Sequence, residues 1–513
     1  MTSTAELQRR TGRGDAPGTG PVEPAARSPW SRLAGPPWAV LLPALAVAAL
    51  VLVGIGSKSL WSDEAFSLAN ARMGLGDLWD LVARREANQG LYLVFLHGWT
   101  ALADGEGWLR LPSALLAIAT VPMLYLVGRR LFGPVAATLA ATLLAVNGMF
   151  VEQAQTARGY TLTIFAVVLA SWCFLRFVDD QTPGRFVAWV AASLLLPYCH
   201  FFGLLVLVGH AASLLFLRDR PLPWRRFLLG GALIGLGSLP IVFVALLKDE
   251  GQLDWVPKTT PTRLLGTIAS LGSGQRAPVV LAAVLALGIA AACLVALAPA
   301  LRRRRLSWPL AFPVCWFAVP IVTASVVSLA RPVLVPRYFS VTVPALALLV
   351  GAGLAALAPR RRAVGAAALV ALSLAAVVNW HRIDSVEDWD GATRYVLDNA
   401  RPDDAVLFVP WHGRIPFELY AEDPIGAGDF PLRIVYPAAD VAPGEYQTGN
   451  PSPLVDRETG ARVARNEDRL WYVYREPRGS EHRDFVQQLE DTGHRPEQTW
   501  SDGRDMQVTL YVR

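Results

Sequence analysis

The chain of 513 residues contains repeated apolar segments of about the length that crosses a bilayer, and these segments constrain its fold more than any other feature. A helix needs about 20 predominantly apolar residues to cross the hydrocarbon core of a membrane. The composition agrees, because 53% of the residues are hydrophobic and only 17% are charged. We therefore predict a polytopic α-helical membrane protein rather than a basic soluble one.

Arginine clusters between the apolar segments predict which side of the membrane each connection faces, because cytoplasmic connections carry an excess of Lys and Arg. The clusters are Arg129 with Arg130, Arg185, Arg218 with Arg220, Arg225 with Arg226, Arg302–Arg305 and Arg360–Arg362. Placing all of them in the cytoplasm requires eleven crossings, at 38–55, 109–128, 134–150, 161–178, 186–199, 201–217, 227–247, 279–298, 307–328, 339–357 and 363–379. The prediction is a multi-pass plasma-membrane protein with a cytoplasmic N-terminus. The net charge of +5 is then a topology signal, and no nucleic-acid partner is expected.

Two segments test this count of crossings. Residues 90–103 are apolar, but if they crossed the bilayer they would place Arg129 and Arg130 outside. We predict an interfacial or re-entrant helix there. The apolar run between Arg185 and Arg218 is too long for one helix and has basic flanks at both ends, so it is predicted to be a hairpin with its turn at 197–200.

The chain divides into three predicted regions. Residues 1–36 are rich in Pro, Gly, Ser and Arg and are predicted to be a disordered cytoplasmic tail that leads into a retained signal anchor. Residues 37–379 are predicted to form the transmembrane domain, with an outer loop at 57–107. In this loop Asp77 can cap an amphipathic interfacial helix with Leu78, Trp79, Leu81 and Val82 on one face. Residues 380–513 are predicted to be a small extracytoplasmic α/β domain. Its expected helices are 389–399 and 484–489, and its expected strands are 405–409, 470–474 and 508–512.

Two adjacent carboxylates, Asp63 and Glu64, follow the first apolar segment within Trp61–Ser67. Two ionised carboxylates side by side repel, so such a site needs a cation or a shared proton. Adjacent residues also point in different directions, so one can face a substrate while the other anchors the loop. A carboxylate at the outer leaflet suits a general base that deprotonates an acceptor hydroxyl. The alternative is that both merely cap the helix that follows.

Arg158 and Arg337 lie in junctions that should face outward, against the positive-inside trend. An arginine at the membrane edge is costly unless it is used, and its planar fork matches the oxygens of a phosphate. We predict a phosphate site. The alternative is that both side chains extend to the lipid headgroups.

His200 lies at the tip of the predicted hairpin, among aromatic residues. It could ligate a divalent metal together with Glu64 or Glu152, donate to a phosphate, or simply pack. The four cysteines fall in or beside apolar segments, which argues against a disulfide or zinc framework. The sequence has no phosphate-binding glycine loop and no dinucleotide-binding turn, so no cofactor is predicted.

The order of these motifs resembles the bacterial, actinobacterial-type branch of the GT-C glycosyltransferases, which is similar to protein O-mannosyltransferases and to the lipid A aminoarabinose transferase. The resemblance covers about residues 38–360 and rests on Trp61–Ser67, Leu91-Tyr92, Leu109–Ser113, Gly128–Gly133, Gln155–Tyr160 and Arg337-Tyr338. The segments Asp388–Tyr395 and Pro402–Asp404 also resemble the start of the outer domain in that branch. The chain departs from the family with Asn88-Gln89-Gly90 in place of His-Pro-Pro, and with Gly148 in place of a proline.

The resemblance implies an inverting membrane enzyme that moves a single sugar, mannose-like or pentose, from a polyprenyl-phosphate donor to a glycan, glycolipid or protein acceptor outside the membrane. It implies Asp63 as the catalytic base, with Glu64 positioning the acceptor or a metal. Four residues are assigned to the donor phosphate: Arg158, Arg337, Tyr160 and Tyr338. Three more are expected to line the site: His200, Gln155 and Tyr92.

A lipid-linked glycan flippase or exporter, or a polymerase that does not use a monophosphate donor, is the competing interpretation. Transport pathways usually place charged residues inside the spans. The predicted spans are nearly free of them, which favours the enzyme.

Overall fold

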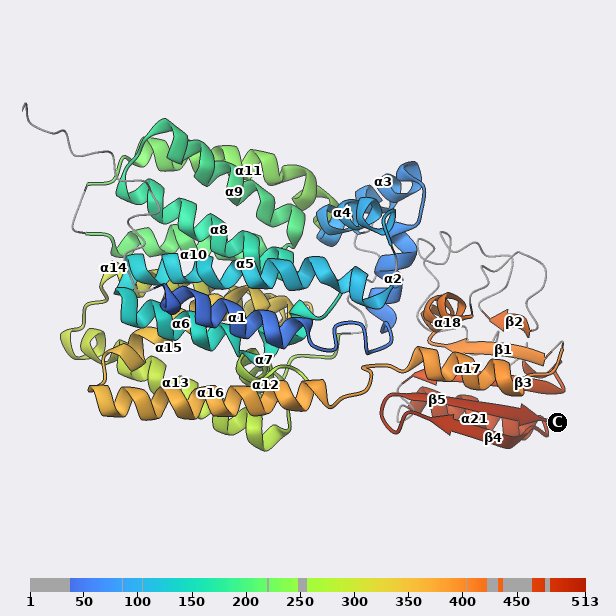
Figure 1. Ribbon diagram of the computed structural model, residues 1–513. Coiled ribbons are helices and arrows are strands. Elements are labelled where there is room, and N and C mark those ends of the chain that lie inside the picture. Colours follow the sequence, from blue (N-terminus) through green and yellow to red (C-terminus); the bar gives the residue numbers. More distant parts are fainter. Residues whose placement is uncertain are drawn as a thin grey trace, which may run out of the picture. The chain divides into compact units, whose positions relative to one another are not determined.

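The structure is a computed structural model that describes residues 37–513, except 85, 104, 219–220, 248–255, 403, 422–431, 437–463 and 476–479 (Figure 1). The described chain is mostly helical and ends in a five-stranded sheet. The predicted tail at 1–36 lies outside the described residues.

An apolar helix, or a bent pair of helices, overlies each predicted crossing. The bounds are α1 Trp38–Leu52, α5 Glu106–Phe132, α6 Pro134–Ala145, α7 Gly148–Ala154, α8 Tyr160–Asp179, α9 Pro183–Cys199, α10 Phe202–Ser213, α11 Trp224–Leu247, α13 Val279–Arg303, α14 Trp308–Val327, α15 Val343–Ala355 and α16 Pro359–His381. In the described part of the chain, seven helices are long and apolar enough to cross a bilayer, or eight if α6 and α7, which meet at a 56° bend, form one span. The polytopic helical fold is confirmed, whereas the number of eleven crossings stays a prediction.

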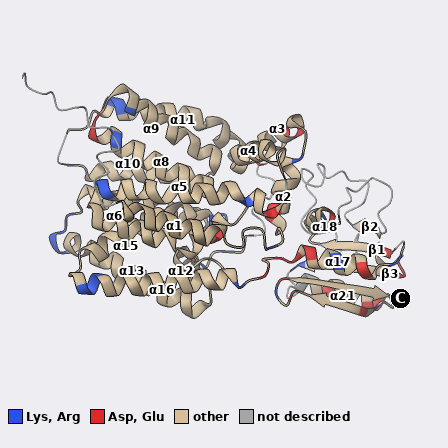
Figure 2. Ribbon diagram, in the orientation of Figure 1, with Lys and Arg blue, Asp and Glu red and all other residues tan. Residues whose placement is uncertain are grey.

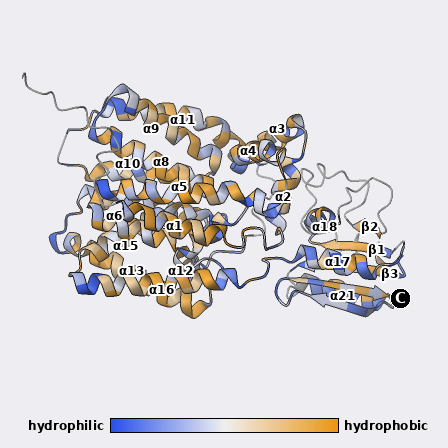
Figure 3. Cartoon of the chain, viewed as in Figure 1, coloured by the Kyte–Doolittle hydropathy of each residue, from blue (hydrophilic) through white to orange (hydrophobic). Residues whose placement is uncertain are grey.

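The surface of the helical part supports a lipid environment. Figure 3 shows mostly hydrophobic residues along α11, α13 and α16. Leu228 of α11 and Leu287 of α13 are exposed, although a soluble protein would bury side chains of this kind. An apolar outer face is what a helix in contact with lipid requires.

The arginine clusters gather at one end of the helix bundle, as predicted. Figure 2 shows basic residues at the ends of these helices that lie away from α2 (Ser62–Ala71). The side chain of Arg130 pairs there with Asp179, which joins the ends of α5 and α8. The shared end agrees with a single cytoplasmic side, and the orientation in the cell stays a prediction.

The loop at 57–107 contains α2, α3 (Leu75–Arg84), a short 3-10 helix η2 (Ala87–Gln89) and α4 (Gly90–Thr100). The last of these matches the short helix predicted at 90–103. The prediction for α3 was partly wrong. The helix begins at Leu75, so Asp77 lies in its first turn and not at its cap, and Trp79 is 66% exposed while Leu78 and Leu81 are buried.

The predicted hairpin is formed by α9 and α10, but its turn lies at His200 and Phe201, because residues 197–199, expected in the turn, still belong to α9. No helix was predicted between the crossings at 227–247 and 279–298, but the structure contains one there, α12 (Pro261–Ser273). Its signal was present in the sequence, because Thr260 accepts a capping hydrogen bond from the Arg263 N–H and Pro261 occupies the first helical position.

The C-terminal sheet has the strand order β2-β1-β3-β5-β4. The strands are β1 Asp404–Val409, β2 Leu432–Tyr436, β3 Arg469–Arg475, β4 Arg495–Ser501 and β5 Met506–Val512, and the helices are α17 Trp389–Asn399, α18 Arg414–Tyr420 and α21 Ser480–Asp491. The first three strands are parallel, and β5 runs antiparallel to β3 and β4. One face carries α17 and α18 around Trp389 and Trp471, and the other carries α21 around Phe485 and Tyr472. The small α/β domain is confirmed, and α18, β2 and β4 were not predicted.

Candidate active site

The acidic doublet lies in the first turn of α2, but neither carboxylate caps the helix. The cap residue Trp61 makes no side-chain capping bond. Instead the Ser62 N–H donates to Glu387 Oε2 at 2.9 Å, and the Ser62 hydroxyl donates to the same oxygen. The side chains of Asp63 and Glu64 are therefore available for other partners.

Glu64 is paired with Arg110 of α5 inside the protein. Arg110 Nε donates to Glu64 Oε1 at 2.8 Å and Nη2 donates to Oε2 at 2.7 Å, with side-chain exposures of 3% and 1%. The other N–H groups of Arg110 donate to the backbone oxygens of Ile55, Lys58 and Ser59. All five guanidinium donors are thus used, and Glu64 Oε1 also accepts from the Ala157 N–H at 2.7 Å. This arrangement fixes the loop that precedes α2.

Asp63 faces Arg337, which lies in the 3-10 helix η4 (Pro336–Thr342) before α15. Arg337 Nη2 is 3.2 Å from Asp63 Oδ2, and the two side chains are 17% and 27% exposed. Arg337 Nε donates to the Tyr160 hydroxyl at 3.0 Å, and the guanidinium lies 5.4 Å from the centre of the Trp61 ring. The carboxylate is therefore paired and still accessible.

Arg158, between α7 and α8, reaches the same helix. Its Nη1 donates to the backbone oxygen of Asp63 at 3.1 Å and to Ser67 Oγ at 3.0 Å. With the Gln89 amide turned so that its oxygen faces the guanidinium, Gln89 accepts from Arg158 Nε at 3.3 Å. The two predicted phosphate arginines are thus brought together at Asp63.

The surroundings of Asp63 favour its ionised form. Burial raises the pKa of this carboxyl, but the positive charges of Arg337 and Arg158 outweigh burial and hold the pKa below its ordinary value. His200 shows the opposite effect. Burial and the same two arginines lower the pKa of His200 to about 3, so its imidazole is neutral at physiological pH.

Three aromatic rings from different segments stand beside Arg337. The ring centres of His200 and Tyr338 are 5.0 Å apart, those of Tyr160 and His200 5.8 Å, and those of Tyr160 and Tyr338 6.4 Å. The His200 turn is held by Asn88, whose side-chain oxygen accepts from the Phe201 N–H at 2.9 Å. Asn88 and Gln89, where this chain departs from its family, therefore support His200 and Arg158.

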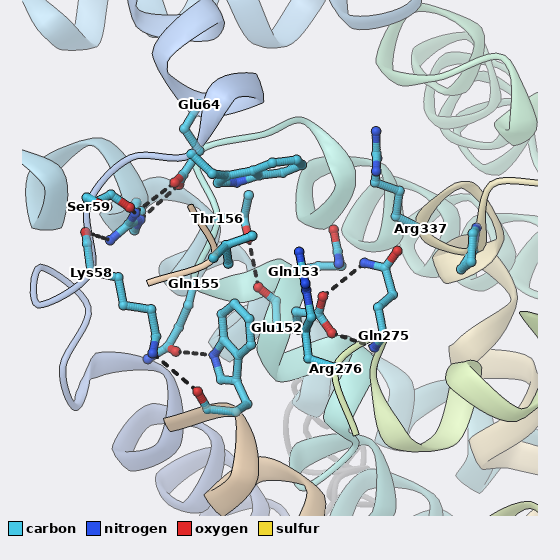
Figure 4. A pocket seen from close by; sticks show the side chains of 15 residues that line it. Lys58, Ser59, Glu64, Glu152, Gln153, Gln155, Thr156, Gln275, Arg276 and Arg337 are labelled. Atoms are coloured by element: carbon cyan, nitrogen blue, oxygen red, sulfur yellow. Dashed lines mark hydrogen bonds and ion pairs between the residues drawn. The ribbon is translucent and has the colours of Figure 1, made fainter. Parts of the chain in front are cut away.

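Arg337 lines a cavity of about 320 Å³, whereas Asp63 and Arg158 are not among its lining residues (Figure 4). Lys58 and Ser59 lie at one end of it in this view, and Gln275 and Arg337 lie at the other. Glu152 is held there by the backbone N–H and the side-chain amide of Gln275, at 2.8 and 2.9 Å. The full lining is Lys58, Ser59, Trp61, Glu64, Arg110, Glu152, Gln153, Gln155, Thr156, Gln275, Arg276, Pro336, Arg337, Trp380 and Val386. Cationic side chains outnumber carboxylates in this lining, which suits an anionic group.

The remaining predicted site residues have packing contacts. Gln155 lines the cavity, and its amide donates to the backbone oxygens of Val51 and Val53 and accepts from Trp380 Nε1 at 2.6 Å, which ties α1 to α16. Tyr92 is buried beside Gly159 and is not among the cavity-lining residues.

The residues named for a metal do not assemble into a centre. Glu64 pairs with Arg110, Glu152 binds Gln275, and His200 packs on Tyr160 and Tyr338. Within the described ranges, no group of three or more His, Cys, Asp or Glu side chains is arranged to hold an ion. Glu64, Glu152 and His200 therefore do not fit a metal.

Several important residues were not assigned a role from the sequence. Arg110 lies within the motif Leu109–Ser113, and Lys58 is one of only three lysines in the chain. Glu387 directly precedes the recognised segment that begins at Asp388. Each had a local signal, but its partner lies far away along the chain.

Comparisons with known proteins agree with this architecture. Residues 91–247, less than half of the chain, match the family model described as dolichyl-phosphate-mannose-protein mannosyltransferase. A search of curated protein sequences finds no match. The fold resembles the crystal structure of ArnT from Cupriavidus metallidurans in the apo state, with a TM-score of 0.57 and 16% identity over 92% of this chain and 97% of that one.

The same transferase bound to undecaprenyl phosphate gives a TM-score of 0.56 at 16% identity over 93% and 98% of the two chains. The Archaeoglobus fulgidus oligosaccharyltransferase in complex with Zn and sulfate gives 0.50 at 14% identity over 92% and 72%. The fold is that of the GT-C glycosyltransferases, and the expected resemblance is confirmed at that level.

Proposed function

We propose that this protein is an inverting glycosyltransferase that moves a single sugar, mannose-like or pentose, from a polyprenyl-phosphate donor to a cell-envelope acceptor at the extracytoplasmic face of the plasma membrane. The observation that carries the proposal is the convergence of Arg337 and Arg158 on the ionised, partly exposed Asp63. A base and a phosphate site are thereby adjacent, at the end of the bundle away from the arginine clusters.

In the proposed reaction, Asp63 accepts the proton of an acceptor hydroxyl while that oxygen attacks the anomeric carbon of the donor sugar. The bond between this carbon and the phosphate oxygen breaks on the opposite face, which inverts the configuration. The phosphate leaves with the bonding electron pair, and Arg337 and Arg158 stabilise the developing negative charge. Glu64 holds α2 through Arg110 and takes no part in proton transfer.

Arg337 has two roles in this scheme. In the described structure it pairs with Asp63, which makes the carboxylate a weaker base. A donor phosphate that binds Arg337 competes for the same guanidinium and leaves Asp63 more basic. The donor therefore primes the base that acts on the acceptor.

The cavity is the proposed compartment for the donor headgroup. Lys58, Arg276 and Arg337 supply positive charge there. Tyr160, His200 and Tyr338 are not among the lining residues, but they stand beside Arg337 and offer surfaces on which a sugar can stack. The structure of ArnT bound to undecaprenyl phosphate supports a polyprenyl-phosphate donor. The matching mannosyltransferase family model supports a mannose-like sugar.

The test is transfer from defined donors in membranes of a deletion strain that expresses each variant. Polyprenyl-phosphate mannose and polyprenyl-phosphate arabinose, labelled in the sugar, are supplied separately, and label in envelope polymers and glycoproteins is counted. Asp63→Asn should abolish transfer at unchanged membrane expression, and Arg158→Ala should mainly raise the donor KM. Asp77→Asn, a carboxylate change in the same outer loop, is the matched control and should transfer normally.

Unchanged turnover in Asp63→Asn would remove this residue from the mechanism. Transfer from a diphosphate-linked oligosaccharide, with none from either monophosphate donor, would favour a polymerase or ligase instead. A strain that accumulates lipid-linked glycan inside the cell but retains transfer activity would favour an exporter.

A further inference from the structure

The segment Lys58–Ser62, which leads into the catalytic helix, is hydrogen-bonded to a distant part of the chain. Lys58 Nζ donates to the backbone oxygens of Trp380 and Ile383 at the end of α16. The Ser59 N–H donates to Ser385 Oγ at 3.1 Å, and Ser59 Oγ donates to the Glu387 backbone oxygen at 2.7 Å. This segment is therefore fixed by the connection between the helical part and the sheet.

The sheet domain contributes a further contact through α18. The Leu60 N–H donates to the Tyr420 hydroxyl at 2.6 Å, and this hydroxyl donates to Glu106 Oε1 of α5 at 3.2 Å. On the next turn, Ala65 of α2 packs against Ile415 of α18. Tyr420 thus joins α18, α5 and the entry to α2.

Glu387 is the centre of these contacts. Its Oε2 accepts from the Ser62 N–H, the Ser62 hydroxyl and Trp389 Nε1, and its Oε1 accepts from Arg475 Nη1 at 2.8 Å. The carboxylate is buried. Burial raises its pKa, but Arg475 and the hydrogen bonds outweigh burial and keep the pKa below its ordinary value. The first turn of α2 is therefore held by an ionised group whose counter-ion comes from the end of β3.

The sheet domain also acts on the charge of Asp63. Besides Arg337 and Arg158, the positive charge of Arg475 lowers the pKa of Asp63. His412 lies nearby in the 3-10 helix η5 (Trp411–Gly413), which precedes α18, but burial and Arg475 lower its pKa to about 4, so it is neutral at physiological pH. Asp63 is thus surrounded by charges from η4, from the α7–α8 junction and from the sheet domain.

We propose that Glu387 is a positioning residue for Asp63, and that the ion pair between Glu387 and Arg475 makes the C-terminal sheet domain an obligatory part of the catalytic site. The proposal rests on the proposed glycosyl transfer. From the sequence, residues 380–513 were predicted only to form a small extracytoplasmic α/β domain. In the structure it holds the turn that carries the base.

Positioning matters because proton transfer requires the base within hydrogen-bond reach of the acceptor hydroxyl. A displacement of about 1 Å can cost about 10²-fold in rate. Releasing Ser62 from Glu387 lets the turn that carries Asp63 shift, without changing the side chains of Asp63, Arg158 or Arg337 themselves. The expected loss is therefore in kcat, with little change in the donor KM.

The experiment compares two arginines of one strand. Arg475 at the end of β3 pairs with Glu387, whereas Arg469 at its start pairs with Asp404 and contacts Glu497. Arg475→Met and Glu387→Gln should each lower kcat for transfer from labelled polyprenyl-phosphate mannose or arabinose by about 10-fold to 10²-fold. Arg475→Lys should restore much of the loss. Arg469→Met removes an equivalent ion pair within the sheet and should retain kcat.

A pH profile separates positioning from simple loss of folding. Arg475→Met removes one positive charge near Asp63, so the acid limb of kcat/KM should move to higher pH, whereas Arg469→Met should leave it unchanged. Hydrogen exchange of the purified protein supplies a readout without substrate, since Glu387→Gln should speed exchange at the Ser62 amide.

Normal kcat and an unshifted acid limb in both Arg475→Met and Glu387→Gln, with Asp63→Asn inactive, would overturn this inference and leave the proposed function intact. Equal losses of kcat in Arg469→Met and Arg475→Met would mean that both changes act only by destabilising the sheet, and this result would also overturn the inference. Full activity of Asp63→Asn would instead defeat the proposed function itself.

Discussion

The buried ion pair of Glu64 and Arg110 gives the sharpest test of whether Glu64 has a structural role while Asp63 acts as the base. Glu64→Gln keeps the shape of the side chain but leaves a buried guanidinium without its counter-ion. Breaking a buried ion pair by neutralising one partner costs about 3–5 kcal/mol. Because 1.4 kcal/mol is a factor of ten, the ratio of folded to unfolded protein should fall by roughly two to three and a half powers of ten.

The assay is thermal unfolding in detergent, followed with a maleimide dye that fluoresces on reaction with thiols. Cys173 and Cys293 are only partly buried, so they are first replaced by alanine in every protein compared. Cys199 and Cys315 are buried and free, so they react only when the helical part opens. Glu64→Gln should unfold at a clearly lower temperature than the parent. Asp180→Asn removes an exposed ion pair with Arg185, worth about 0–1 kcal/mol, and is the control.

The two roles of Glu64 predict opposite patterns. If Glu64 positions α2, Glu64→Gln should unfold at a lower temperature than the parent, and the fraction that is still folded at low temperature should retain measurable turnover. If Glu64 instead touched the acceptor or a metal, Glu64→Gln would lose turnover while it unfolded at the parent temperature. That second pattern would refute the assignment of Glu64 to Arg110.

Two further changes test other parts of the site. Arg337→Met removes the positive charge that lowers the pKa of Asp63 most, while burial still opposes ionisation of this carboxyl. The pKa of Asp63 should therefore rise, and the acid limb of the kcat/KM profile should move to higher pH. An unchanged acid limb would show that Asp63 is not the titrating base. Gly148→Ala would place a Cβ 2.2 Å from the Ser273 backbone oxygen, so it should cost about 1–3 kcal/mol in the dye assay, whereas Gly266→Ala meets nothing within 4 Å and should not destabilise.

Local patterns in the sequence predicted most of the elements. Hydrophobic runs located the apolar helices, and α17 was predicted with the bounds that the structure shows. The failures have physical causes. The strand β4 (Arg495–Ser501) is almost wholly exposed and lacks the alternation of apolar residues that marks a half-buried strand. The helix α12 was not predicted, because its amphipathic segment is shorter than the stretch needed to cross a membrane.

The site was predictable in its residue types but not in its pairings. Charge at a membrane edge is costly, so Asp63, Arg158 and Arg337 stood out from the sequence. Local sequence patterns do not indicate that Glu64 pairs with Arg110, or that Ser62 is hydrogen-bonded to Glu387. These contacts join positions far apart in the chain, and hydrophobic periodicity carries no information about them.

The charges that meet around α2 support the proposed phosphate site. Each carboxylate has its own cation, since Glu64 pairs with Arg110, Asp63 with Arg337 and Glu387 with Arg475. Arg158 is held on α2 by neutral oxygens, those of the Asp63 backbone, Ser67 and Gln89. The carboxylates whose charges act on Arg158 are those of Asp63 and Glu86, and neither is its hydrogen-bond partner through the carboxylate. In the proposed reaction, a donor phosphate would supply charge-assisted hydrogen bonds to Arg158, whose present hydrogen-bond partners are neutral.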